Sequence, residues 1–209
     1  MEIEKFKSEF YSELLNLHKE ASVNFVLEKL HNNDITVKTL YTEVLTPFLN
    51  NLKVEIWEEH IISGIIRTII ECCYPFVLNS FPSKKTSKKV LILCPPEEYH
   101  ELGARMGSDF FTMAGYDSYF IGSNTPKEDF VTLINKMNPY YIVISVTNYY
   151  NLFSTKEIIQ HIKQLKLPVK IIAAGGAFIN YEDSCEDIGV DMILHNFEDI
   201  NKFTAEVIK

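Results

Sequence analysis

An imidazole and a carboxylate lie close together in the segment that follows the first short apolar run of the C-terminal half. His100 comes after the run 90–94, and Glu98 precedes it by two residues. A neutral imidazole can coordinate a metal ion through one ring nitrogen, while a nearby carboxylate holds the other nitrogen and fixes the tautomer. A single histidine in a loop is more often a plain polar residue, so this pair gains meaning only from its surroundings.

Hydroxyl groups and glycines follow two later apolar runs in the same way. Ser145 and Thr147 stand at the end of the run 140–146, and the pair Gly175-Gly176 follows the next run. Hydroxyls can donate to a polar ligand, and glycines let the backbone approach one closely. The alternative is structural, because Ser and Thr after a strand are often caps and a glycine pair is often a turn.

Five short apolar runs alternate with helical stretches in this half of the chain. They are rich in Val, Ile and Leu, and they cover 90–94, 118–121, 140–146, 169–174 and 192–194. Such runs predict strands buried on both faces, and their alternation with helices predicts a flavodoxin-like, doubly wound α/β fold with a five-stranded parallel sheet. Ligands of these folds bind outside the carboxyl ends of the strands, so we expect the polar loops to meet there.

These residues form a pattern that closely resembles the cobalamin-binding domain of methionine synthase, corrinoid methyl carriers and cobalamin-dependent light sensors. That family carries Asp-x-His-x-x-Gly, then Ser-x-Leu or Ser-x-Thr, then Gly-Gly. In this chain the three pieces, separated by 41 and 27 residues, are Glu98-x-His100-x-x-Gly103, Ser145-x-Thr147 and Gly175-Gly176. The resemblance covers roughly residues 88–209.

The resemblance implies cobalamin as the cofactor, in a form that is left open, and a role for each residue. His100 would displace the cofactor's own dimethylbenzimidazole and coordinate cobalt as the lower axial ligand, with Glu98 accepting a hydrogen bond from its other nitrogen. Glu98 replaces the family's Asp and is one methylene longer, so we expect that bond to be indirect or altered. The displaced nucleotide tail would meet the hydroxyls of Ser145 and Thr147 and pass the clearances left by Gly103, Gly175 and Gly176.

A flavin- or nucleotide-binding domain is the main alternative on fold alone. Such a domain needs a loop rich in Gly, Ser or Thr after the first strand, where backbone N–H groups can hold a phosphate. The loop here reads Pro95-Pro96-Glu97-Glu98, which is acidic and lacks backbone donors at both prolines. We therefore prefer the cobalamin interpretation.

The first half of the chain has a helical period instead. Phe6, Phe10 and Leu14 recur every four residues, and the stretch 35–49 shows one clear amphipathic face that Pro47 should kink or close. A further helix is expected from about residue 55 to the region before Pro75. We predict a bundle of about four helices over 1–80, a linker over 81–89 and the α/β domain over 90–209.

The helical half resembles the cap of CarH-type cobalamin-dependent regulators, whose bundle covers the upper corrin face. The resemblance rests on the stretch 41–47 and on Glu58-Glu59-His60, although the tryptophan those regulators place further upstream is Leu49 here. It implies upper-face cofactor-binding roles for Trp57, Glu59 and His60. The alternative is a solvated helix face opposite the isoleucines.

Composition narrows the function classes. The net charge is −8, and residues 1–80 carry six Lys and one Arg against eleven Glu and one Asp, so we expect no direct contact with nucleic acid. The start of the chain lacks the pattern of a secretory signal and no uninterrupted apolar run reaches about 20 residues, so we expect a cytoplasmic protein that is not inserted in a membrane. The four cysteines form no C-x-x-C motif and are expected to be reduced.

The sequence favours a cobalamin-binding sensor that takes part in transcription regulation, in one version a photoreceptor, and that acts through a protein partner rather than through a DNA-binding head. The alternative is a corrinoid methyl carrier of a methyltransferase system, which is the one way in which we would expect the chain to serve as part of an enzyme. A cobalamin storage or delivery protein is a further alternative function. For the assembly, a homo-oligomer is among the expected states.

Overall fold

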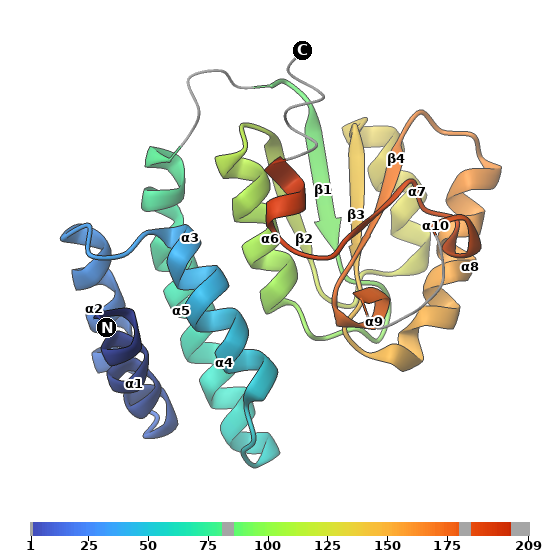
Figure 1. Ribbon diagram of the computed structural model, residues 1–209. Coiled ribbons are helices and arrows are strands. Elements are labelled where there is room, and N and C mark those ends of the chain that lie inside the picture. Colours follow the sequence, from blue (N-terminus) through green and yellow to red (C-terminus); the bar gives the residue numbers. More distant parts are fainter. Residues whose placement is uncertain (1, 81–85, 180–184, 202–209) are drawn as a thin grey trace. The chain divides into compact units, whose positions relative to one another are not determined.

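The computed structural model describes residues 2–80, 86–179 and 185–201 of the 209-residue chain. The chain divides into two compact units, Met1–Ser80 and Phe81–Lys209, which are treated separately below (Figure 1). Most of the linker that we predicted at 81–89 lies outside the described residues, and its last residue, Lys89, already begins the first strand.

The first unit is made of helices, as the sequence predicts. Its elements in chain order are α1 (Glu2–Leu15), α2 (Lys19–His31), α3 (Val37–Thr39), the π-helical segment η1 (Leu40–Leu45), α4 (Thr46–Asn51) and α5 (Ile56–Asn79). Because α3, η1 and α4 follow one another without a break, the described residues of this unit form four helical stretches. The last of them begins with a reciprocal cap, in which the backbone N–H of Glu55 donates to Glu58 Oε2 at 2.9 Å.

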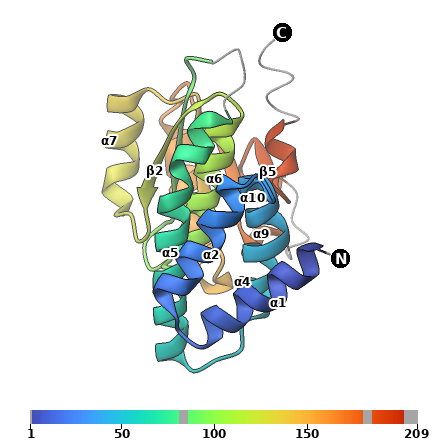
Figure 2. The same ribbon diagram turned by 90° about the vertical axis from the view of Figure 1, so that its left-hand side faces the viewer.

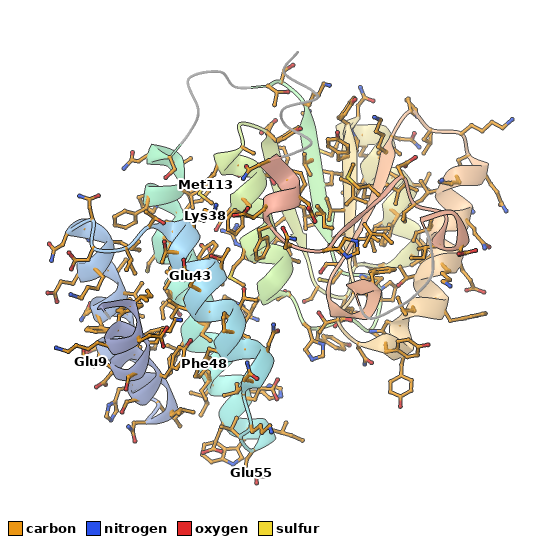
Figure 3. The ribbon with its side chains drawn as sticks, viewed as in Figure 1. Glu9, Lys38, Glu43, Phe48, Glu55 and Met113 are labelled. Carbon is orange, nitrogen blue, oxygen red and sulfur yellow. The ribbon has the colours of Figure 1, made fainter. Side chains whose placement is uncertain are left out.

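Apolar side chains from all four stretches form the core of this unit. Tyr11 on α1 stacks at an angle on Phe48 of α4, with ring centroids 4.8 Å apart, and its hydroxyl donates to the carbonyl of Val44 at 2.8 Å. Figure 3 labels Phe48 on its helix and Glu55 near the start of α5. The fully buried members of this core include Phe10, Leu14, Val26, Leu40, Tyr41, Leu45, Ile66 and Ile70.

Of the two predicted effects of Pro47, a kink or an early end of the helix, the early end is wrong. The helix changes to π geometry over Leu40–Leu45 and continues to Asn51. Within this stretch the N–H of Thr46 donates to Tyr41 O, five residues back, and the Thr46 hydroxyl donates to the same oxygen at 2.7 Å. A π turn widens the helix directly before the proline, where the ring would otherwise clash with the carbonyl four residues earlier.

Helix α5 also runs further than predicted, because it continues through Pro75 to Asn79. Pro75 lies on the exposed face of the helix, where a proline, which has no N–H to donate, interrupts the packing of the unit least. By length and composition alone α5 could cross a membrane, and the core helix of a soluble protein meets the same test. Here the side chains that point into the unit, such as Ile62 and Ile69, are buried.

The second unit contains the predicted parallel sheet. Its elements are β1 (Lys89–Leu93), α6 (Leu102–Met113), β2 (Asp117–Gly122), α7 (Lys127–Met137), β3 (Tyr141–Ser145), η2 (Tyr149–Asn151), α8 (Leu152–Gln164), β4 (Lys170–Ala174), α9 (Gly176–Ile179), α10 (Cys185–Ile188) and β5 (Met192–Leu194). The strand order is β2-β1-β3-β4-β5, and every neighbouring pair is parallel, which confirms the flavodoxin-like fold.

Helices cover both faces of the sheet (Figures 1 and 2). Helix α6 packs on β1 and β2. On the other face, α7 and α8 close a core that includes Leu91, Phe130, Ile144 and Ile159. The expectation that all strands are buried on both faces is wrong for β2, whose residues alternate in exposure because it lies at the edge of the sheet.

The strand order reverses direction at β1 and β3. After β1 the chain crosses to β2 on one side, and after β3 it crosses to β4 on the other. The loops that leave these two neighbouring strands therefore diverge, which opens the position where doubly wound folds bind ligands. The predicted lower-face residues lie in these loops and in the turn after β4.

Candidate functional site

A strained turn at the end of β1 directs Glu98 into the protein. The N–H of Glu98 donates to Pro95 O at 3.1 Å, and Glu97 adopts a left-handed backbone conformation with φ of 63°. Asn124 in the β2–α7 loop clamps this turn, because its side-chain oxygen accepts from Glu97 N at 2.9 Å and its N–H donates to Glu98 O at 3.0 Å. A non-glycine residue in this conformation costs energy that the surrounding bonds must offset.

Glu98 binds His100 directly. The distance from Glu98 Oε1 to His100 Nδ1 is 2.7 Å, and the same oxygen accepts from the backbone N–H of His100 at 3.0 Å. The carboxylate side chain is fully buried, whereas the imidazole is 55% exposed. We expected this bond to be indirect or altered, and the first of these alternatives is wrong because the contact is direct.

The second carboxylate oxygen of Glu98 contacts a different loop from the first, which the longer side chain of Glu allows. Oε2 accepts from the backbone N–H groups of Thr147 at 2.9 Å and Asn148 at 2.8 Å, and from Asn151 Nδ2 at 3.3 Å. These donors belong to the segment between β3 and α8. One buried carboxylate thus joins the loop after β1 to the loop after β3.

These bonds also decide the charge of Glu98. Burial by itself raises the pKa of the carboxyl, but the hydrogen bonds from the His100 ring and from the backbone of Asn148, His100 and Thr147 outweigh it and lower the pKa from 4.5 to about 2. The group is consequently ionised at neutral pH and acts as an acceptor. An acceptor at Nδ1 favours the tautomer with the proton on Nδ1, which leaves the Nε2 lone pair for a metal.

The nearby thiol is not a competing ligand. Cys94 is buried beneath the loop, with its Sγ 3.9 Å from His100 O. Burial, with the charges of Glu98 and Glu101, raises the pKa of Cys94 to about 12, so the thiol stays protonated, whereas metals bind the thiolate. Among the described residues, Cys72 and Cys73 form no disulfide. Among the described residues no three His, Cys, Asp or Glu side chains gather to hold a metal ion, which leaves His100 as a single-residue ligand candidate.

The predicted hydroxyl residues lie at the same edge of the sheet. Ser145 is the last residue of β3 and is buried, while Thr147 is exposed two residues further on. Thr147 reaches the site through its backbone N–H, which binds Glu98. The sequence identified the position of Thr147 but not this backbone role.

The glycines of the predicted motif differ in what surrounds them. Gly175 has φ of +101°, and an added Cβ would lie 2.3 Å from Val146 O, so this glycine is required by the contact between the turn after β4 and the end of β3. An added Cβ at Gly103 or Gly176 would meet nothing within 4 Å. Gly175 therefore has a structural reason within the protein, and the role of Gly103 and Gly176 in leaving clearance for a ligand stays a prediction.

Gly175→Ala is expected to destabilise the cofactor-free protein by about 3 kcal/mol or more, because the methyl group cannot avoid the backbone of Val146 and the left-handed conformation adds strain. Thermal or urea unfolding measures this loss. Gly176→Ala is the matched control and should stay within about 0.5 kcal/mol of the wild type. Equal stabilities for both variants would contradict the packing reason for Gly175.

The predicted upper-face residues lie in the other unit. Trp57, Glu59 and His60 stand in the first turns of α5, and all three are exposed, with Trp57 58% accessible. Arg67 and Glu71 continue the same exposed stripe. Their proposed contacts with a corrin stay a prediction.

Sequence reasoning missed three asparagines. Asn124, Asn148 and Asn151 hold the loops around Glu98 and His100 through the bonds given above. A usable signal was present for two of them, because Asn148 and Asn151 come directly after β3, where polar loop residues gather in this fold. Their link to Glu98 spans about fifty positions and needs the folded chain.

The site fits the lower side of a corrinoid in its donor chemistry. A half-exposed imidazole is backed by a buried, ionised carboxylate, which is the arrangement that orients metal-bound histidines. A cobalt ion held by corrin nitrogens needs one axial ligand from the protein, so a cluster of protein ligands is unnecessary.

The comparisons with known proteins agree with this chemistry. Residues 88–202, more than half of the chain, match the family model described as the B12 binding domain. No curated protein sequence matches this chain. Among solved structures, the monomethylamine corrinoid protein of Methanosarcina barkeri is similar with a TM-score of 0.80 and 15% identity, covering 98% of this chain and 99% of that chain.

Two further structures show weaker likeness. A cobalamin-binding protein from Desulfitobacterium hafniense has a TM-score of 0.50 and 18% identity, with 96% of this chain and 97% of that chain covered. The methanol:cobalamin methyltransferase complex of Methanosarcina barkeri has a TM-score of 0.53 and 14% identity, with 98% of this chain and 80% of that chain covered. At these identities the likeness concerns the fold.

Proposed function

This chain belongs to the B12-binding domain family, and from that premise we propose that it is a corrinoid protein that carries a methyl group for a methyltransferase system. Cobalamin is its cofactor. When bound, the cofactor supplies a cobalt centre that can receive and release a methyl group. The protein's own residues bind the cofactor, orient its axial ligand and leave its reactive side within reach of a partner.

We assign the lower axial position to His100. Glu98 accepts the Nδ1 proton of the ring, so Nε2 would serve as the neutral donor to the cobalt. Ser145 and Thr147 offer hydroxyls to the cofactor's displaced nucleotide tail, and Gly103 and Gly176 leave room for it. This division of roles agrees with the exposure of the imidazole and the burial of its carboxylate partner.

The observation that carries the choice of a methyl carrier is the similarity in fold over the whole chain. The monomethylamine corrinoid protein matches both units of this chain from end to end, so the helical unit as well as the sheet has its counterpart there. A second neighbour is a methanol:cobalamin methyltransferase complex, which supports a methyltransferase as the protein partner. The sequence alone favoured a sensor, and this similarity moves our proposal to its alternative.

The sensor, in its light-responsive and transcription-regulating form, is the competing function. It rests on the likeness of the segment before His60 to the cap of light-sensing regulators. The exposed Trp57 and His60 at the start of α5 are the residues that would serve it. No residue contact described above favours it over the carrier, so it enters the experiment as the other outcome.

A methylation assay separates the two functions. The purified protein, loaded with hydroxocobalamin and reduced, is mixed with a methylamine or methanol methyltransferase and its methyl donor, and methylcobalamin formation is followed by absorbance. We expect methylation with at least one donor and enzyme pair, and its loss when the enzyme is omitted. His161→Ala, a substitution on the exposed face of α8, should methylate as fast as the wild type.

Green light supplies the second arm of the experiment. The adenosyl- and methylcobalamin forms are illuminated, and the mass of the protein is measured before and after by light scattering. A change of oligomeric state with light, together with no methylation by any enzyme tried, would replace the carrier with the sensor. Failure to bind any form of cobalamin would contradict both the carrier and the sensor function.

A further inference from the structure

The side-chain amide of Asn151 lies at the junction of the two loops that hold the imidazole. Its Nδ2 donates to Glu98 Oε2 and to the backbone carbonyl of Glu97, each at 3.3 Å. Asn151 is the last residue of η2 and is 6% exposed. A buried amide with these two acceptors ties the start of α8 to the strained turn that carries Glu98.

Asn151 itself sits on a well-held backbone. Its carbonyl accepts from the hydroxyls of Thr155 at 2.6 Å and Ser154 at 3.1 Å, and its N–H donates to Asn148 O at 3.0 Å. Thr155 is fully buried in α8. The amide is thus presented to Glu98 from a rigid element rather than from a free loop.

The carboxylate of Glu98 needs such support because its last torsion is soft. Rotation about the bond to a terminal carboxylate has a broad energy profile, so neighbouring donors decide its angle. Three donors on Oε2 leave Oε1 in line with the ring nitrogen of His100. If one of them is removed, the carboxylate can turn and the ring can follow it.

We infer that Asn151 is a positioning residue for the lower axial ligand, which sets the angle of the Glu98 carboxylate and, through it, the tautomer and tilt of the His100 ring. The inference rests on the proposed role of His100 as the cobalt ligand. Asn151 acts through Glu98 and is not itself assigned to the cofactor.

The test compares Asn151→Ala with Ser154→Ala in the full chain. The first removes the amide, while the second removes a bond to the same residue without touching Glu98. In the cofactor-free protein, nitrogen-15 NMR of the His100 ring measures the share of the tautomer protonated on Nδ1. We expect that share to fall in Asn151→Ala and to be unchanged in Ser154→Ala, with melting temperatures recorded to verify folding.

The cofactor adds a second readout. The Kd for hydroxocobalamin, measured by absorbance, should rise about three- to tenfold in Asn151→Ala, which is less than the 10–100-fold typical when a direct partner of a metal ligand is lost. Asn151→Asp keeps the shape but places an acceptor against Glu98, so a larger loss is expected. Wild-type tautomer and Kd in both Asn151 variants would overturn the inference.

The two hypotheses fail differently. If His100→Ala leaves the spectrum of bound cobalamin unchanged, the assignment of His100 as the ligand is wrong. The tautomer of His100 in the cofactor-free protein still reports whether Asn151 positions the ring. A folded Asn151→Ala protein with the wild-type tautomer distribution contradicts the inference even if cobalt ligation by His100 holds.

Discussion

His100→Ala is expected to remove the lower axial ligand of the bound cofactor while leaving the fold intact. The absorption spectrum should change from that of a histidine-ligated cobalt to that of cobalamin carrying its own base or water, and affinity should fall by about 100-fold or more, beyond the loss typical of an outer partner. The fold should tolerate the change because the ring is 55% exposed and Glu98 keeps the backbone N–H at position 100 as a donor. Absorption titration with hydroxocobalamin and circular dichroism measure the two effects.

His161→Ala provides the matched control, since it removes an exposed imidazole from α8 in the same unit. It should bind cobalamin with the wild-type spectrum and affinity. If His100→Ala and His161→Ala give the same spectrum as the wild type, another residue holds the cobalt or the cofactor keeps its own base. Under either explanation, His100 is not the residue that binds the cobalt.

Glu98→Ala is expected to damage both stability and cofactor binding. The substitution removes the acceptor of the backbone N–H groups of Thr147 and Asn148 and one of the two acceptors of the Asn151 amide, and a buried donor left unpaired costs about 1–3 kcal/mol. We therefore expect a loss of about 3 kcal/mol or more in the free energy of unfolding. The affinity for hydroxocobalamin should fall about 10–100-fold, as is typical when the partner of a metal-bound histidine is removed.

Glu98→Asp tests the length of the side chain separately from its charge, and it restores the residue that the wider family uses at this position. The shorter side chain cannot hold His100 Nδ1 and the three donors after β3 at once. We expect it to be less stable than the wild type and to bind cobalamin more weakly, in spite of the retained charge. Glu97→Ala removes a carboxylate from the adjacent exposed position and should change neither property appreciably.

The same carboxylate makes stability depend on pH in a defined window. Its pKa is about 2 in the folded protein against an ordinary 4.5, so folding favours the ionised form. The resulting stabilisation, about 3 kcal/mol, is present above pH 4.5 and is lost as the pH falls toward 2. The test measures the free energy of unfolding of the cofactor-free wild type and of Glu98→Gln from pH 7 to pH 2. The difference between these two free energies should narrow only between pH 4.5 and pH 2. A gap that stays constant across this range is the contradicting result.

Much of the architecture could be read from local sequence patterns. Short apolar runs predicted all five strands within one residue of their observed bounds. For the central strands the reason is that burial in a parallel sheet selects apolar residue types, whereas β2 at the edge is only partly buried. The spacing of His100, Ser145 and Gly175 pointed to one edge of the sheet, since parallel strands bring their carboxyl ends together. The two prolines were harder, because whether Pro47 or Pro75 ends a helix depends on how the rest of the helix packs.

The pairing of His100 with Glu98 was also within reach of the sequence, because residues two apart in one loop are neighbours whatever the fold. What the other oxygen of Glu98 does was not, because its donors stand about fifty positions away and meet it only when β1 and β3 lie side by side. The same holds for Gly175, whose need for a missing side chain arises from the backbone of Val146. The residue types thus determined that this protein carries an imidazole backed by a carboxylate as its metal-binding group. The tertiary structure decided how rigidly that imidazole is held, because long-range hydrogen bonds and backbone contacts exist only in the folded chain.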